Sequence, residues 1–302
     1  MRVTDQQIFR STQNDVLTAR NRLFEAQKKV ATGRNINAPS DDPIGMKKVL
    51  GYESSLMSIT QFERNINFGK SWIQTAEQSL AHADELLTEA RDIAINQSSQ
   101  HFDQDTRDSA IKIVEGLYDQ LMDMANSRLG GSFIFAGYNN ETQPFERDSD
   151  YNITYTGDDG ALGLRISENS TISLNANGEE IFQIDDPGGG APISVFDLLR
   201  DLRTALQNDD LTGIQDQIPL LGVVKDHLQD VRAENSGQHL RMGMTEAHLS
   251  KVRLNVENSL SDLQQADMAS AVLELQMEQT AYEAALSAAS RVFQQSLLDF
   301  LN

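Results

Sequence analysis

Hydrophobic residues recur every seven positions over long parts of the chain, a spacing typical of helices that pair as coiled coils. The first of these lines is joined by a companion line three residues further on. The members of the first line are Tyr52, Ile59, Ile66, Ile73, Leu80, Leu87 and Ala94, and those of the companion line are Phe62, Gly69, Ala76, Ala83 and Ala90. This pattern predicts one long helix whose apolar seam packs against a partner helix.

A matching seam lies far downstream. Its main line is Ile214, Leu221, Leu228, Asn235, Met242, Leu249, Val256 and Leu263, with Val224, Val231, Thr245, Val252 and Ala266 as companions. Asn235 is a polar residue on this line, and such a residue can fix the register of a pair at some cost in stability. A third, shorter amphipathic helix is predicted at Val114–Met124. The two long seams predict an antiparallel helical rod built from both halves of the chain.

Between the two seams, residues 131–185 change character. The runs SFIFAGYNN, NITYTG, LGLRIS, STISLN and EEIFQI are rich in β-forming residues and are separated by Gly, Asn and Asp. GDDG (157–160) and ANGEE (176–180) suit hairpin turns, and DDPGGGAP (185–192) suits a linker. We therefore expect a small antiparallel β domain inserted at the distal end of the rod.

The two ends of the chain carry apolar stripes of their own. At the start these residues are Phe9, Val16, Leu23 and Val30, and at the end they are Leu275, Tyr282, Leu286, Phe293, Leu297 and Phe300. Residues 1–50 hold 9 Lys/Arg against 5 Asp/Glu, whereas residues 240–302 hold 4 against 8. The oppositely charged ends are expected to pair as a coiled coil, within one chain or between chains, and to form the assembly interface.

These patterns predict a mainly α fold with an inserted β domain: an elongated antiparallel helical rod with coiled-coil termini. The expected segments, in chain order, are a terminal coiled-coil segment 1–38 that pairs with 268–302, a first rod half 39–129, the β-rich insertion 130–191, a second rod half 192–267 and the C-terminal coiled-coil segment 268–302.

The stretch VATGRNINAPSDDP (30–43) separates the first two helical patterns. Gly33 suits a left-handed helix C-cap, Pro39 favours extended backbone before it, and Ser40, Asp41 or Asp42 can cap the next helix with Pro43 in its first turn. The predicted loop residues are Gly33, Arg34, Asn37, Pro39, Asp41, Asp42 and Pro43. Besides forming a hinge, Arg34, Asp41 and Asp42 are candidates for contacts with neighbouring subunits.

Composition excludes several classes of function. The net charge of −20 argues against nucleic-acid binding, which needs a basic face. There is no cysteine for disulfides or thiolate metal sites, and no apolar run approaches the roughly 20 residues of a membrane span. Asp5, Gln6 and Gln7 interrupt the region where a cleaved signal peptide would be apolar.

The sequence also offers no candidate for catalysis or cofactor binding. The Gly-Gly-Gly at 188–190 lacks the Lys-Ser/Thr of a phosphate-binding loop, and the five histidines show no metal-ligand spacing. No G-x-S-x-G elbow occurs, and the carboxylates follow the outer faces of the heptad helices. We therefore expect neither an enzyme nor a bound metal.

Three stretches together resemble the flagellin family. They are VATGRNINAPSDDP (30–43), FIFAGYNNETQPFERD (133–148) and the C-terminal run that ends in SLLDFLN. In flagellin itself the loop tends to have Ala-Asp-Asp-Ala where this chain has Ser40 to Pro43. That difference and the SLLDFL finish are more similar to the family members that stand at the junction between hook and filament.

The resemblance implies a structural protein of the bacterial flagellum, outside the cell, that joins the hook to the filament. It implies hook-associated protein 1, flagellin and further copies of the chain in a ring as partners. It also implies export of the unfolded chain through the flagellar type III apparatus without a cleaved signal, with an export chaperone holding the C-terminal helix.

Three alternatives stay open. Flagellin itself would follow the same physics, although Pro43 and the SLLDFL end argue against it. A cytoplasmic coiled-coil adaptor would not explain the apolar stripes at the two ends of the chain or the β insertion. An enzyme is the weakest alternative, because residues 131–185 contain no histidine to support a hydrolytic site.

Overall fold

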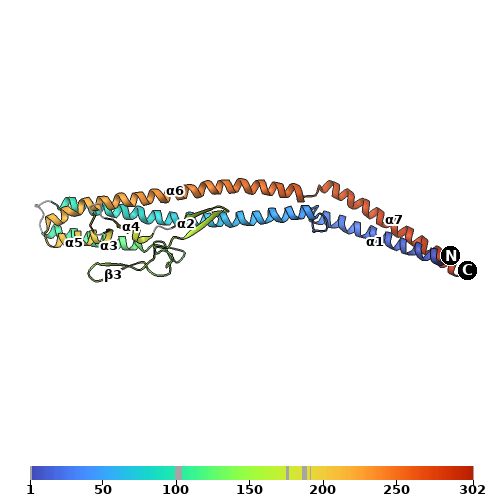
Figure 1. Cartoon of the computed structure of the whole chain (residues 1–302), viewed down its shortest axis with the longest axis horizontal. Coiled ribbons are helices and arrows are strands. Elements are labelled where there is room, and N and C mark those ends of the chain that lie inside the picture. Colours follow the sequence, from blue (N-terminus) through green and yellow to red (C-terminus); the bar gives the residue numbers. More distant parts are fainter. Residues whose placement is uncertain (1, 99–103, 175–176, 186–188, 191, 302) are drawn as a thin grey trace. The chain divides into compact units, whose positions relative to one another are not determined.

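The structure is a computed structural model that describes residues 2–98, 104–174, 177–185, 189–190 and 192–301, with backbone alone for 2–6 and 293–301. Most of the chain is helical (Figure 1). The helices are α1 (Arg2–Thr32), α2 (Pro43–Gln97), α3 (Gln104–Ala125), α4 (Gly178–Phe182), α5 (Val195–Gln207), α6 (Leu211–Gln264) and α7 (Met268–Leu301). The strands are β1 (Arg128–Leu129), β2 (Ser132–Phe133), β3 (Phe145–Arg147), β4 (Ile153–Tyr155), β5 (Gly163–Ser167), β6 (Ser170–Ser173), β7 (Gln183–Ile184) and β8 (Ile193–Ser194).

The chain divides into two compact units. We call residues 1–58 with 251–302 the terminal unit, and residues 59–250 the central unit. Both α2 and α6 contribute a segment to each unit. The helices are interrupted at 33–42 and 265–267, close to the expected boundaries between the terminal segments and the rod at 38 and 268. The boundaries of the two compact units lie within α2 and α6, at 58 and 250.

In the central unit α2 and α6 pair in antiparallel fashion, and the predicted seam forms the core. From Ile59 to Ala94 every residue of the first heptad line is buried, and so is the second line from Ile214 to Leu249, including Asn235. Ion pairs cross between the helices: Lys70 pairs with Glu246, and Arg232 Nε donates to Glu77 Oε1 at 2.8 Å. The prediction of two long paired helices is confirmed for this unit.

Further elements cover the free sides of this pair. The predicted third helix is α3, which buries Val114, Leu117 and Leu121 and packs against α5, where Arg203 Nε donates to Glu115 Oε1 at 2.7 Å. Ser79 Oγ on α2 donates to Ser127 Oγ, which follows α3, at 2.8 Å. The α2–α6 pair therefore has a third helical layer on one side.

The predicted β region exists, but it is not one sheet. In the described part of the chain the strands form four separate antiparallel pairs, β1–β2, β3–β4, β5–β6 and β7–β8. We expected this region at the distal end of the rod. Its hairpins instead lie along the helices, since Asn65 Nδ2 on α2 donates to the carbonyl of Arg165 in β5, whose guanidinium stacks over Phe62.

Two local predictions in this region are wrong. Residues 178–182 form helix α4 rather than a strand after a hairpin turn, because Asn177 Oδ1 accepts from Glu179 N at 2.9 Å and caps the helix. GDDG (157–160) lies between β4 and β5, which belong to different sheets, so it is not a hairpin turn. Asp158 Oδ1 fixes this segment by accepting a hydrogen bond from Tyr138 N at 2.7 Å. The expected linker 185–192 is the loop between β7 and β8, of which 186–188 and 191 lie outside the described residues.

The terminal unit buries far less apolar surface. Among its described side chains, the buried hydrophobic ones are Ala26, Ile36, Val49, Ala271 and Ala289. Burial of apolar surface is the main favourable term in folding, and a narrow seam of mostly alanine supplies little of it. The terminal unit is therefore the less stable of the two.

We predict that urea unfolds the terminal unit before the central unit. Trp72 is the only tryptophan and is 2% exposed in the central unit, so its fluorescence reports that unit alone. Far-UV circular dichroism should lose part of the helical signal at lower urea concentration than the fluorescence change. A single transition with coincident midpoints for both signals would contradict this expectation.

Candidate assembly surface in the terminal unit

Helices α1 and α7 lie side by side, with the two chain ends together (Figure 1). Val16, Leu23 and Val30 on α1 are half-buried at seven-residue spacing, and Leu275 and Tyr282 are half-buried on α7. The alanines at the seam allow the two helices to approach closely, and Lys29 Nζ bonds Glu274 Oε2 at 3.0 Å across it. The pairing therefore occurs within one chain.

Other residues of the predicted interface lie elsewhere. Phe9 is 49% exposed and Leu286 is 43% exposed. The α7 seam runs through Tyr282, Ala285 and Ala289, so Leu286 lies one position outside it. After Tyr282 the next core position of a heptad that continues to Ala289 can lie three residues on, at Ala285, or four residues on, at Leu286. The sequence pattern alone does not distinguish these two positions. The side chains of Phe293, Leu297 and Phe300 lie outside the described residues.

The two helix breaks of this unit are bonded to each other. Asn35 N donates to the carbonyl of Gln264 at 2.8 Å, and Ala266 N donates to the carbonyl of Gly33 at 2.9 Å. Gly33 ends α1 with φ +66°, the left-handed conformation predicted for it. These backbone bonds join the loop after α1 to the loop before α7.

Asp42 caps α2. Its Oδ1 accepts from Ile44 N at 3.0 Å and from Gly45 N at 2.9 Å, and Pro43 occupies the first helical position as predicted. A Cβ at Gly45 would lie 2.6 Å from Ile36 Cδ1, so glycine is needed there for Ile36 to be buried. Sequence reasoning missed the Gly45–Ile36 contact, because no local pattern reports packing between a loop and the next helix.

Asp41 stabilises the loop itself. Its Oδ2 accepts from Asn37 N and from Ala38 N, both at 2.9 Å, and Asn37 Nδ2 donates to the carbonyl of Arg34 at 2.9 Å. The bond from Asn37 N, followed by that from Ala38 N, lowers the pKa of the Asp41 carboxyl. The carboxylates of Asp41 and Asp42 thus accept hydrogen bonds within the chain, while both residues, like Arg34 and Pro39, are exposed to solvent. That these residues contact neighbouring subunits stays a prediction.

Asp267 plays the corresponding part at the start of α7. Its Oδ1 accepts from Ala269 N at 3.0 Å, and its Oδ2 accepts from Ser270 Oγ at 2.9 Å. The hydrogen bond from the Ser270 side chain, followed by that from Ala269 N, lowers the pKa of Asp267. Sequence reasoning missed this cap, although Asp just before an apolar helical run is a recognisable N-terminal signal.

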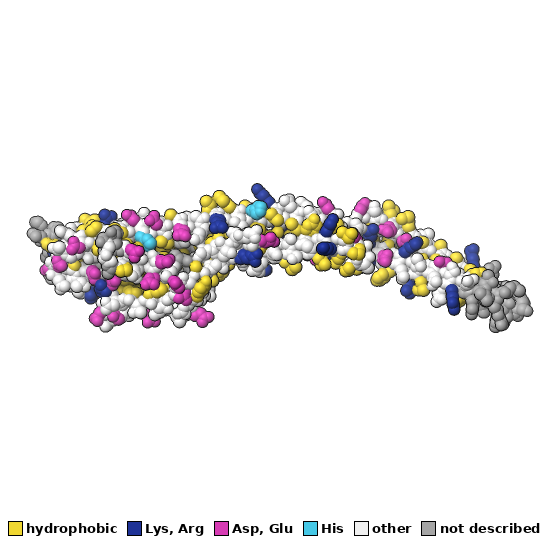
Figure 2. All heavy atoms as spheres, in the orientation of Figure 1, with side chains coloured by type: hydrophobic (Ala, Val, Ile, Leu, Met, Phe, Trp, Pro, Cys, Tyr) yellow, Lys and Arg dark blue, Asp and Glu magenta, His cyan; other side chains and the backbone are white. Residues whose placement is uncertain are grey.

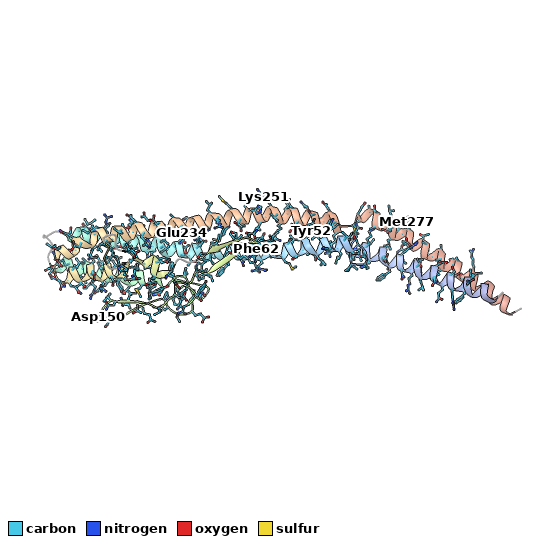
Figure 3. The ribbon with its side chains drawn as sticks, viewed as in Figure 1. Tyr52, Phe62, Asp150, Glu234, Lys251 and Met277 are labelled. Atoms are coloured by element: carbon cyan, nitrogen blue, oxygen red, sulfur yellow. The ribbon has the colours of Figure 1, made fainter. Side chains whose placement is uncertain are left out.

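The outer faces of α1 and α7 leave large apolar side chains in solvent. Phe24 on α1 and Met277 on α7 are each 66% exposed, and Figure 3 shows Met277 on the side of α7 away from α1. Figure 2 shows hydrophobic side chains open to solvent along α7. An open groove on α7 is lined by Leu273, Gln276, Met277, Thr280, Ala281 and Ala284. Exposed apolar stripes of this kind mark surfaces that associate with other molecules.

The described residues contain no group of three or more His, Cys, Asp or Glu side chains that could hold a metal ion. Within the same residues, every helix is too short or too polar to cross a bilayer.

Sequence profiles of one family match both ends of the chain. The bacterial flagellin N-terminal helical region matches residues 3–140, and the bacterial flagellin C-terminal helical region matches residues 221–301. These ranges include α1, α2 and α3 at one end and α7 with most of α6 at the other.

The relatives differ in how much of their own length matches this chain, and a solved structure resembles it in fold. Flagellar hook-associated protein 3 of Escherichia coli K12 is 23% identical over 306 residues, which cover 95% of this chain and 96% of the relative. Flagellin of the same strain is 24% identical over 207 residues, but the match covers only 38% of it. The structure of a flagellar hook-associated protein from Vibrio parahaemolyticus matches 74% of this chain and 100% of its own, with TM-score 0.67 and 20% identity.

The caps predict how the terminal unit responds to acid. The pKa values of Asp41 and Asp267 are lowered, so their ionised forms stabilise the folded state fully above the ordinary carboxyl value of 3.8. That stabilisation is lost as pH falls through the lowered folded pKa. We expect the first thermal transition to shift down as pH falls below about 4, and Asp41→Asn to reduce this shift.

Asp15→Asn provides the control, since Asp15 is an exposed carboxylate on α1. It should leave the pH dependence of the first transition as in the unmodified chain. An acid shift of the same size in Asp41→Asn and in the unmodified chain would contradict the assignment.

Proposed function

The chain belongs to the bacterial flagellin family and is a structural component of the flagellum, and we propose that it forms the junction between the hook and the flagellin filament. The observation that supports this proposal is the share of each relative that the sequence match covers. The chain spans nearly the whole of a hook-associated protein 3, whereas the flagellin it matches is more than twice as long as the matched part. No catalytic role is proposed.

In this proposal the terminal unit is the part that assembles. The seams of α1 and α7 pack against each other within the chain, so the outer faces of both helices remain for neighbours. Leu17 and Phe24 on α1, and Leu273 and Met277 on α7, are exposed on these faces. Burial of each such side chain contributes about 1.5–3 kcal/mol. Further copies in a ring, hook-associated protein 1 and flagellin are the neighbours we propose.

The opposite charges of the two ends support the same arrangement. Residues 1–50 are net basic and residues 240–302 are net acidic, so the α1 face of one copy attracts the α7 face of the next. Such a head-to-tail contact produces a ring when its rotation closes. Export through the flagellar apparatus, with a chaperone on the C-terminal helix, is a further part of the proposal and rests on the family alone.

The proposal predicts a fixed number of copies per flagellum. A junction ring has a constant number of subunits, whereas a filament subunit increases in number with filament length. Quantitative mass spectrometry of flagella sheared to different mean lengths should give a constant amount of this chain per hook. An amount that rises in proportion to filament length would identify a flagellin instead.

The groove on α7 can be tested by substitution. We expect the double variant Leu273→Asp/Met277→Asp to keep its helical content, because both positions are solvent-exposed near the start of α7. It should fail to restore swimming to a strain that lacks the gene, since a buried unpaired carboxylate is strongly unfavourable in an interface. Full swimming would exclude this face from assembly.

A matched control places the same charges elsewhere on the helix. Gln279→Asp/Ser287→Asp adds two carboxylates at exposed polar positions of α7 outside the groove. This variant should swim as the unmodified chain does. Loss of swimming in both double variants would point to net charge rather than to the groove.

A further inference from the structure

Asn177 and Gly178, at the start of α4, form the one Asn-Gly dipeptide of the sequence. In such a dipeptide the backbone nitrogen of glycine can attack Cγ of asparagine, because no Cβ on the glycine obstructs the approach. A bond forms from Gly178 N to Asn177 Cγ, the bond from Cγ to Nδ2 breaks, and the amide proton leaves with Nδ2 as ammonia. Water then opens the five-membered ring to aspartate or isoaspartate, which completes deamidation.

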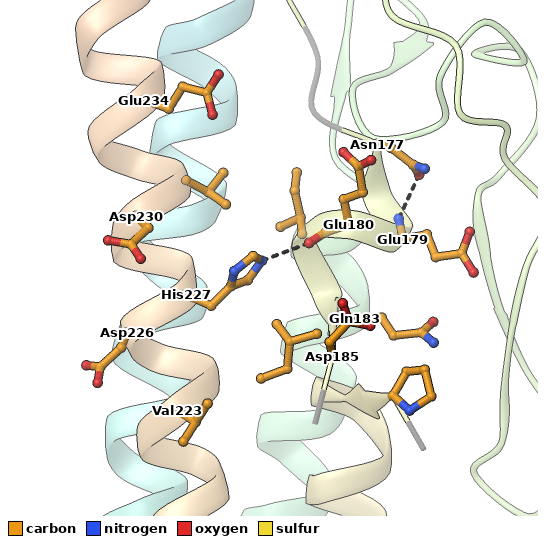
Figure 4. A pocket seen from close by; sticks show the side chains of 14 residues that line it. Asn177, Glu179, Glu180, Gln183, Asp185, Val223, Asp226, His227, Asp230 and Glu234 are labelled. Atoms are coloured by element: carbon orange, nitrogen blue, oxygen red, sulfur yellow. Dashed lines mark hydrogen bonds between the residues drawn. The ribbon is translucent and has the colours of Figure 1, made fainter. Parts of the chain in front are cut away.

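Packing and capping account for the presence of both residues. Gly178 is buried, and a Cβ on it would lie 2.4 Å from the carbonyl oxygen of Phe135 and 3.1 Å from the ring of Phe145. Asn177 caps α4, because its Oδ1 accepts a hydrogen bond from Glu179 N at 2.9 Å (Figure 4). Close packing therefore requires the glycine and capping favours the asparagine, and together they leave a reactive dipeptide in the central unit.

The folded backbone keeps the two reacting atoms apart. Asn177 has ψ 132°, in the extended region. Ring closure brings Cβ of asparagine and the next nitrogen into an eclipsed arrangement about the Cα–C bond, which an L-residue reaches only at negative ψ. Gly178 N also donates its proton to the carbonyl of Phe135 in a hydrogen bond of 3.1 Å, and the attack requires that proton to leave. Asn177 therefore reacts only after this segment has left its folded position.

The contacts around the segment hold it in place. The carbonyl of Phe135 also accepts from Tyr155 Oη at 3.0 Å, and the same hydroxyl lies 3.2 Å from the carbonyl oxygen of Asp158. Phe182 of α4 is buried, and its ring packs edge-on against Phe135 with 5.6 Å between centroids. Release of Asn177 therefore requires α4 to separate from the β region, which exposes this aromatic surface to water.

We propose that Asn177 is a deamidation site that the folded central unit keeps closed, and that isoaspartate at this position prevents α4 from returning to its place. Asn177 borders an open cleft between α4 and α6, so water reaches the ring once it has formed (Figure 4). Isoaspartate adds one methylene to the backbone before Gly178. The bond to Glu179 N and the bond from Gly178 N to Phe135 then lose their common register.

Peptide mapping by mass spectrometry tests the closed state. The full chain is incubated at mildly alkaline pH, either folded in buffer or in enough urea to unfold it, and conversion of Asn177 is followed with time. We expect conversion to be slower by about tenfold or more in the folded chain, and tenfold corresponds to an opening free energy of about 1.4 kcal/mol. Equal rates in the two states would overturn the proposal.

Two matched variants locate the contact that keeps the site closed. Tyr155→Phe removes the hydroxyl beside the carbonyl of Phe135, and in the folded chain it should speed conversion by about twofold to tenfold, the equivalent of one hydrogen bond. Tyr138→Phe also removes one hydroxyl, which donates to the carbonyl of Ala161 at 2.9 Å, and it should leave the rate unchanged. The same rate in both variants would contradict the role assigned to Tyr155. Trp72 fluorescence verifies that each variant is folded.

Refolding tests the consequence of the reaction. Asn177→Asp keeps an oxygen that can accept from Glu179 N, and its carboxylate resists attack by the backbone nitrogen. After a long incubation in urea and return to buffer, this variant should regain slow amide hydrogen exchange over residues 179–182. In the unmodified chain, the fraction with fast exchange there should equal the fraction that carries isoaspartate. Slow exchange in chains with isoaspartate at 177 would show that α4 returns despite the reaction, and would overturn this part of the proposal.

Discussion

A pair of helices can bury only one stripe of each partner, so the remaining faces need a third layer or a neighbouring molecule. In the central unit that layer is present: α3, α5 and the β region cover the α2–α6 pair, and a Cβ at Gly69 would clash with Leu164 of β5. In the terminal unit the described chain provides no third layer for α1 and α7. Phe24 and Met277 therefore stay in solvent. Because of this difference in burial, the central unit is the more stable one, and the terminal unit has the exposed apolar surface through which the chain can associate.

The terminal unit relies on hydrogen bonds where apolar burial is small. Asp42 and Asp267 cap the helices that follow the two breaks, Asp41 closes the first loop, and backbone bonds of Gly33 and Asn35 tie that loop to the second. Neighbouring copies that covered the outer faces of α1 and α7 would supply the missing apolar burial. A subunit built in this way can be stable in its core and still gain much of its terminal stability on assembly.

The parts that could be predicted from sequence are those governed by a repeat. Seven-residue spacing located α2, α6 and the α1–α7 seam, and turn chemistry predicted the conformation of Gly33 and the position of Pro43. The failures are local and have physical causes. Residues 179–182 of the EEIFQI run lie in α4 because Asn177 caps the helix, whereas Gln183 and Ile184 form β7. Leu286 and the position of the β region depend on tertiary packing, which no single-chain pattern encodes.

A junction protein occupies one position along the flagellum, and labelling of intact flagella tests directly whether this chain does so. An antibody raised against the exposed loop around Asp150, between β3 and β4, would be detected with gold particles in the electron microscope. For a junction protein we expect gold in a single narrow band where the hook meets the filament. Gold along the whole filament, or gold absent from flagella while the protein is found in the cytoplasm, would contradict it.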